Sequence, residues 1–159
     1  MKRHLFAVKI GMVMMGDKVF LDTNIVLRGL LRQMDLHIPV DKMLKQMTRD
    51  GKEFWISGQV IREFMVQATH PKTLQTPLTI DEVIREIELV KPLFTIADET
   101  SLVRDILFQL VRQYPTRGKQ IHDANLVAVM LAYDIENLFT LNVDDFKRFT
   151  DKINIITLS

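Results

Sequence analysis

Short apolar runs alternate with amphipathic segments along this chain, and this alternation constrains the fold more than any other feature of the sequence. Runs with the apolar content of buried strands lie at residues 18–22, 53–56, 93–96, 138–141 and 153–157. Between them, apolar residues recur at helical spacing, which predicts helices over 23–33, 40–49, 57–69, 79–91, 98–113, 121–133 and 144–149. Strands that alternate with helices favour a parallel sheet covered on both faces. We therefore expect an α/β fold, a single doubly wound domain with a central, mostly parallel five-stranded sheet flanked by helices.

Local signals support these boundaries. Ser57 and Thr79 stand where helix N-caps are expected, and Glu82 completes a capping box with Thr79. Gly51 follows the second predicted helix, where a left-handed residue is expected. The five prolines lie where elements begin or end, at Pro39, Pro71, Pro77, Pro92 and Pro115.

Composition excludes several classes of protein. A chain of 159 residues suits one domain with a substantial core. The absence of cysteine excludes disulfides and thiolate metal sites, and it fits a cytoplasmic protein. The net charge is +1, so affinity for nucleic acid would need a local basic patch. No run of about 18 apolar residues predicts a membrane span.

Residues 1–17 precede the predicted domain, which we place at 18–159. They begin like a secretory signal, but Lys9 interrupts the apolar run and no small-residue cleavage site follows. We interpret this segment as an N-terminal extension, with Met14 and Met15 as alternative true starts of the protein.

Acidic residues occur at the ends of predicted strands and at the starts of the helices that follow. Asp22 ends the first strand, Asp144 and Asp145 follow the fourth strand, and Asp123 lies in the first turn of a helix. These positions share one edge of a parallel sheet, so topology alone brings Asp22, Asp123 and Asp145 together. Crowded carboxylates repel each other, and a divalent cation relieves that repulsion. Carboxylates without cysteine are typical ligands of the hard cations Mg²⁺ and Mn²⁺.

Each acid also has a purely structural explanation. Asp22 and the Asp144–Asp145 pair suit helix N-caps, and Asp123 complements a helix dipole. Glu63 lies well off the apolar stripe of its helix, so a solvated position explains it unless the helix leans across the sheet edge.

Four short motifs resemble those of PIN-domain ribonucleases. They are Leu21-Asp22-Thr23-Asn24, Glu63 after a serine-capped helix start, His122-Asp123-Ala124, and Thr140-x-Asn142-x-x-Asp145-Phe146. The resemblance covers about residues 18–157 and is greatest to the VapC-like toxins of type II toxin–antitoxin systems. The front extension and a longer insert over 74–92 depart from the family pattern.

The resemblance implies a catalytic site made of metal-binding acids. These fall on Asp22, Glu63, Asp123 and Asp145, and the supporting polar positions on Asn24, Thr140, Asn142 and Asp144. Asp144 and Asp145 compete for the fourth acid, and we favour Asp145 because it directly precedes Phe146. His122 is interpreted as a helix cap or a hydrogen-bonding partner of the site rather than as a general base.

The same resemblance implies hydrolysis of RNA phosphodiester bonds with Mg²⁺ or Mn²⁺ as cofactor. The expected partners are an RNA substrate, an antitoxin protein and a second copy of the chain in a homodimer. A basic cluster in and before the loop that leads to Asp123 is the candidate RNA contact, at Arg112, Arg117 and Lys119. An antitoxin helix would find a hypothetical groove at Met43, Met47, Phe64 and Met65.

Two other functions remain open on sequence alone. The first is a non-catalytic module of the same fold that binds RNA or protein and keeps a vestigial acidic site. The second is a receiver-like or phosphatase-like domain in which Asp22 accepts a phosphoryl group. It fits poorly, because residue 24 is Asn24 where such phosphatases have a second acid.

Overall fold

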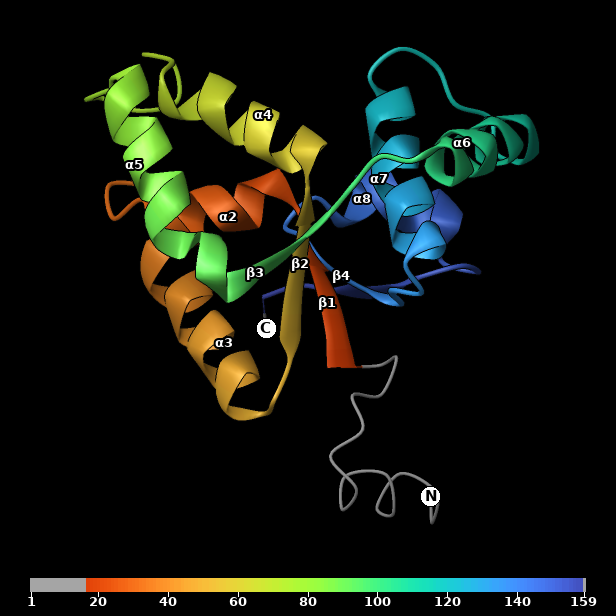
Figure 1. Ribbon diagram of the computed structural model, residues 1–159, viewed down its shortest axis with the longest axis horizontal. Helices are drawn as coiled ribbons and strands as arrows, with labels where there is room; N and C mark the ends of the chain where they lie inside the picture. Colours follow the sequence, from red (N-terminus) through yellow and green to blue (C-terminus); the bar gives the residue numbers. More distant parts are fainter. Residues whose placement is uncertain (1–16, 159) are drawn as a thin grey trace.

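A parallel sheet of five strands forms the centre of the computed structural model, which describes residues 17–158 (Figure 1). The strands are β1 (Lys18–Leu21), β2 (Glu53–Ser57), β3 (Phe94–Ala97), β4 (Asn137–Phe139) and β5 (Asn154–Ile156). They lie in the order β3-β2-β1-β4-β5, and each neighbouring pair is parallel. The predicted α/β fold is confirmed, and the chain changes direction along the sheet at the central strand β1.

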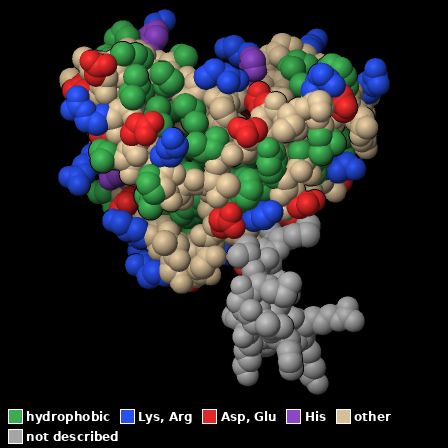
Figure 2. All heavy atoms as spheres, viewed as in Figure 1, with side chains coloured by type: hydrophobic (Ala, Val, Ile, Leu, Met, Phe, Trp, Pro, Cys, Tyr) green, Lys and Arg blue, Asp and Glu red, His purple; other side chains and the backbone are tan. Residues whose placement is uncertain are grey.

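Helices cover both faces of this sheet. They are α2 (Thr23–Leu30), α3 (His37–Arg49), α4 (Gly58–Ala68), α5 (Ile80–Val90), α6 (Ser101–Gln113), α7 (Gln120–Ala132) and α8 (Val143–Phe146), with 3₁₀ turns η2 (Lys91–Leu93) and η3 (Lys147–Phe149). Figure 1 shows α2 to α5 grouped on one side of the sheet and α6 to α8 on the other. In the same view, Figure 2 shows a notch at the upper edge between the two groups, with cationic and acidic side chains beside it.

The predicted caps are largely confirmed. Ser57 caps α4 by accepting the backbone N–H of Val60 at a long 3.5 Å, and Thr79 and Glu82 form the reciprocal capping box of α5. Gly51 has a φ of 78°, the left-handed conformation that a glycine adopts without a steric penalty.

Several predicted boundaries are wrong by about three residues. The first helix ends at Leu30 instead of residue 33, because Leu31 is already extended. The second begins at His37 instead of Val40, with Pro39 in its first turn, where a missing N–H costs no helical hydrogen bond. The helix expected from residue 98 begins at Ser101, and the segment predicted as one helix over 144–149 is divided between α8 and η3.

The core explains why the acidic end of β1 is so well placed. Val19, Phe20 and Leu21 have no exposed surface, because the central strand is covered on both faces. On the α6–α8 side, α7 is buried from Leu126 to Met130 without a break. Buried neighbours on both sides hold the end of β1, and therefore Asp22, in a defined position.

No helix within residues 17–158 is long and apolar enough to cross a bilayer. The predicted extension over 1–17, with its alternative starts, lies outside the described residues except for Asp17, which forms an ion pair with Lys52 at 3.2 Å.

Candidate active site

Asp22 is held at the end of β1 by hydrogen bonds to both carboxylate oxygens. Its Oδ1 accepts the backbone N–H of Thr23 at 2.8 Å as the N-cap of α2. Its Oδ2 accepts the hydroxyl of Thr140 at 2.7 Å and the amide of Asn24 at 3.1 Å. Only 8% of Asp22 is exposed, and this burial raises the pKa of its carboxyl although the hydrogen bonds act in the opposite direction. The capping role and the candidate catalytic role therefore coexist.

Thr140 joins the ends of β1 and β4. It is fully buried, and its hydroxyl donates to Asp22 while accepting from Asn24 at 3.3 Å and from the backbone N–H of Asn142 at 3.0 Å. Asn24 closes the arrangement by accepting the backbone N–H of Leu141 at 3.2 Å. One donor and two lone pairs of the hydroxyl are thus used, which is the full capacity of a threonine.

Glu63 reaches this site from α4. Its Oε2 accepts the hydroxyl of Thr23 at 2.6 Å, and its Oε1 accepts the amide of Gln59 at 2.9 Å. The residue is half-buried. Glu63 is therefore tied to the residue that follows Asp22, and it is not the freely solvated side chain that its position off the apolar stripe suggested.

Gln59 is the polar residue that sequence reasoning missed. It is only 7% exposed, and its amide nitrogen donates to Glu63 and to the backbone carbonyl of His122 at 3.1 Å. Its carbonyl oxygen accepts from Asn125 at 2.8 Å, and Asn125 also donates to Glu99 at 2.9 Å. The signal in the sequence was a polar residue one helical turn before Glu63 (i, i+4), which places both on one face of α4.

Asp123 lies half-buried in the first turn of α7 and responds to the other acids. Burial is the main cause that raises its pKa from 3.8 to about 6, and the charges of Asp145, Asp22 and Glu63 raise it further, in that order. Arg148 lowers the pKa in part. Asp22, Glu63 and Asp145 therefore all lie within electrostatic range of Asp123. The sheet topology predicted this for Asp22 and Asp145, and Glu63 joins them from α4.

Asp144 and Asp145 differ in their surroundings. Both are exposed in the first turn of α8, and both line a shallow depression with residues 141–143. Asp144 forms an ion pair with Lys147, whereas Asp145 is the member of the pair that raises the pKa of Asp123. Asn142 is exposed and bonds Thr140 through its backbone N–H, and His122 is also exposed.

The donor chemistry of this site fits a hard divalent cation. The candidate ligands are carboxylate oxygens, and, after burial, repulsion by the other acids is a further cause of the raised pKa of Asp123. Among residues 17–158, however, no three acidic or histidine side chains are close enough together to form a ready-made cage around an ion. Magnesium tolerates such an open arrangement, because it keeps several water ligands and needs only one or two protein carboxylates.

Comparison with known proteins identifies the fold family. Residues 19–152, most of the chain, match the family model described as the PIN domain. The chain belongs to the PIN domain family. A search of curated proteins gives no match for this PIN domain.

Solved structures with the same fold include proteins of toxin–antitoxin systems. VapBC2 from Rickettsia felis, solved with a promoter DNA fragment, is 16% identical with a TM-score of 0.66, covering 89% of this chain and 99% of that one. FitAcB from Neisseria gonorrhoeae is 18% identical with a TM-score of 0.64, covering 87% and 96%. VapC20 from Mycobacterium tuberculosis, a toxin that cleaves the sarcin–ricin loop, is 13% identical with a TM-score of 0.60, covering 80% and 92%. At these identities the likeness shows the fold alone.

The three predicted RNA-binding residues of this PIN domain do not lie together. Arg117 lines an open pocket beside α8 together with Lys147 and Arg148. Arg112, in the last turn of α6, and Lys119 are exposed but do not line that pocket. Of the predicted RNA-binding trio, only Arg117 therefore joins this pocket.

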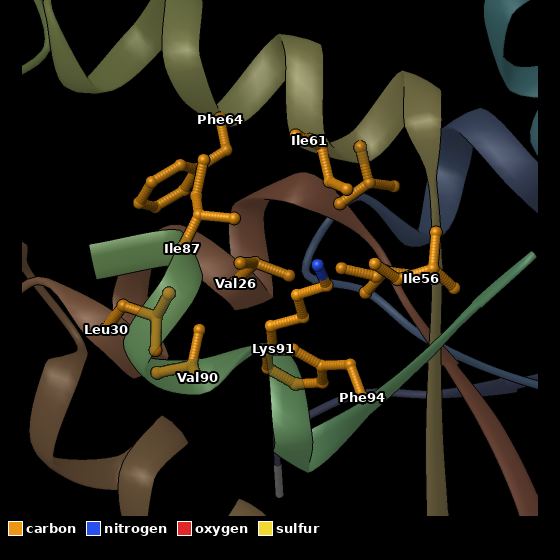
Figure 3. Close-up of a pocket in the computed structure, with 11 residues that line it drawn as sticks. Val26, Leu30, Ile56, Ile61, Phe64, Ile87, Val90, Lys91 and Phe94 are labelled. Atoms are coloured by element: carbon orange, nitrogen blue, oxygen red, sulfur yellow. The ribbon is translucent and has the colours of Figure 1, made fainter. Parts of the chain in front are cut away.

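An apolar pocket on the other side of the PIN domain is separate from the acids (Figure 3). It is lined by Val26, Leu30, Ile56, Val60, Ile61, Phe64, Ile87, Val90, Lys91, Phe94 and Ile96. Of the four hypothetical groove residues, only Phe64 lines it. Met47 and Phe64 are buried in the core, so these two are wrong as residues of an exposed groove. Met43 and Met65 are partly buried against the core, and their part in a groove stays a prediction.

Proposed function

We propose that this PIN domain is a metal-dependent ribonuclease that hydrolyses RNA phosphodiester bonds, and that it acts as the toxin of a toxin–antitoxin pair. The observation that carries the proposal is the gathering of acids at one edge of the sheet, where Thr140 holds Asp22 and Thr23 holds Glu63 by hydrogen bonds. The raised pKa of Asp123, caused by burial and by the charges of Asp145, Asp22 and Glu63, agrees with this gathering. A site that concentrates negative charge in this way is unfavourable for the fold and suits cation binding.

The residues that would hold Mg²⁺ or Mn²⁺ are Asp22, Glu63, Asp123 and Asp145. When bound, the cation supplies Lewis-acid chemistry, since it lowers the pKa of a water ligand and stabilises charge on a phosphate during in-line displacement. With a pKa of about 6, Asp123 is mostly ionised at pH 7 and offers its carboxylate as a ligand.

The other polar residues orient these acids. Thr140 and Asn24 fix one oxygen of Asp22, while Thr23 and Gln59 each hold one oxygen of Glu63. Side chains fixed before binding lose less conformational freedom when the site assembles, which favours both affinity and rate.

The partners are part of the same proposal. VapC20 supports an RNA substrate, and VapBC2 supports an antitoxin partner. A homodimer and a cytoplasmic location complete the proposal, and light scattering of the purified chain tests the dimer.

The deciding experiment is cleavage of total RNA by purified protein with Mg²⁺, with Mn²⁺ and with EDTA. We expect metal-dependent cleavage that is lost in Asp22→Asn and Asp123→Asn. Glu88→Gln, which removes an exposed acid on α5, should cleave like the wild type. Folded, partner-free protein that cleaves nothing with either metal would refute the ribonuclease and favour the non-catalytic module.

A further inference from the structure

A cationic pocket lies next to the acidic residues of α8. It is lined by Val111, Pro115, Thr116, Arg117, Gln120, Asp144, Lys147 and Arg148. Asp144 also lines the shallow depression that contains Asp145, so the two surfaces are continuous. Arg148 is close enough to Asp123 to lower the pKa of its carboxyl. The pocket therefore borders the candidate active site.

Hydrogen bonds hold the side chain of Arg148 in this pocket. One terminal nitrogen of Arg148, Nη1, donates to the carbonyl of Pro115 at 2.8 Å and to the side-chain oxygen of Gln120 at 3.0 Å. The same oxygen of Gln120 accepts the backbone N–H of Arg117 at 3.1 Å. Gln120 thus ties the loop before α7 to η3. A guanidinium fixed through one nitrogen keeps its remaining N–H groups for another acceptor.

The charge and donors of the pocket favour an anion. Arg117, Lys147 and Arg148 outnumber the single acid Asp144, which already forms an ion pair with Lys147. The hydroxyl of Thr116 is buried and has no hydrogen-bond partner among residues 17–158. Arginine, lysine and threonine side chains are common donors to phosphate oxygens of nucleic acids.

We propose that this pocket binds a phosphate of the RNA strand next to the phosphate that is cleaved, and so sets the position of the strand over the acids. The inference rests on the proposed ribonuclease function and deepens it by assigning a substrate subsite. Positive charge beside an acidic centre also offsets the repulsion between the carboxylates and the incoming RNA backbone.

The test measures RNA binding without cleavage. Fluorescence anisotropy with a labelled single-stranded RNA, across a series of salt concentrations, gives Kd and its salt dependence in the Asp123→Asn background. Arg117→Gln and Lys147→Gln are the test variants, because both side chains are exposed. Lys42→Gln, an exposed lysine on α3, is the matched control.

Each test variant should weaken RNA binding about fivefold at 0.1 M salt and reduce the salt slope by about 0.7, the counterion release expected for one lost contact to a single strand. The double variant should lose about 25-fold if the two contacts are independent. In the cleavage-competent chain, KM should rise by similar factors while kcat stays within about twofold, since the subsite does not touch the reacting atoms. Lys42→Gln should change none of these values.

Test variants that bind RNA like Lys42→Gln, with the same salt slope, would overturn the subsite even if the wild type cleaves RNA. A selective loss of binding together with a wild type that never cleaves would instead refute the ribonuclease and leave the phosphate pocket standing. Arg148→Gln, checked for an unchanged melting temperature, should give the largest loss of binding, and an intact fold with unchanged binding would also overturn the subsite.

Discussion

Replacing Asp123 by asparagine should stabilise this PIN domain at neutral pH while it abolishes cleavage. In the wild type, burial and three neighbouring carboxylates raise the pKa of Asp123 from 3.8 to about 6. The folded state therefore favours the protonated form, and ionised Asp123 opposes folding. Asparagine keeps the shape of the side chain and removes the charge.

The size of the effect follows from the pKa of Asp123. The difference between 3.8 and about 6 corresponds to about 3 kcal/mol at 1.36 kcal/mol per pKa unit. Asp123 is only half-buried, so solvent screening reduces this to about 1–1.5 kcal/mol. For a domain of this size, that gain raises Tm by about 2–6 °C.

The size of this penalty depends on pH. The penalty is absent below the unfolded pKa near 3.8, where Asp123 is protonated in both states, and it is fully present above the folded pKa near 6. The free energy of unfolding of Asp123→Asn, relative to wild type, should therefore rise between about pH 4 and pH 6 and then level off.

Urea unfolding at pH 4 and pH 7.5, in EDTA, measures this difference directly. Asp105→Asn, which removes an exposed carboxylate on the neighbouring helix α6, is the control. The reasoning is refuted if Asp123→Asn is no more stable than the wild type at pH 7.5, or if its advantage is equally large at pH 4.

Two further substitutions test how the acids are held. Thr140→Val should lower the free energy of unfolding by about 1–3 kcal/mol, because the buried Asp22 loses its hydroxyl donor. Urea unfolding measures this loss. Thr140→Ser keeps the hydroxyl, so an equal loss in that variant would contradict the hydrogen-bond explanation. Gln59→Met should weaken Mn²⁺ binding about 10- to 100-fold, because one oxygen of Glu63 loses its donor. Titration followed by the electron paramagnetic resonance of free Mn²⁺ gives the affinity, and the idea fails if Gln67→Met, on the same helix, has the same effect.

The alternation of strands and helices could be predicted without a structure, because a strand that is buried on both faces needs a continuous run of apolar residues. Val19, Phe20 and Leu21 form a continuous apolar run, as a central parallel strand requires. Helix ends were less predictable. The first helix ends before Leu31, and the second begins two residues before Pro39. Packing and backbone geometry set these two boundaries, and local residue preference does not.

The candidate site, too, could be predicted only in part from the sequence. Asp22, Asp123 and Asp145 could be brought together from sequence, because the ends of parallel strands and the starts of the following helices meet at one edge of the sheet. The sequence did not reveal that Gln59 bridges α4 and α7, since its partners Glu63 and Asn125 lie on two different helices.

The apolar pattern and the local signals of the sequence were enough to predict the sheet, most helix caps and the sheet edge where the acids gather. The tertiary structure alone decided which neighbours those acids have. Only the folded chain selects Arg117 from the basic trio and places it with Lys147 and Arg148. Only in the folded chain do burial and the charges of Asp145, Asp22 and Glu63 raise the pKa of Asp123. Electrostatic and hydrogen-bond energies depend on distances of a few ångströms between residues far apart in the chain, and sequence spacing carries no record of those distances.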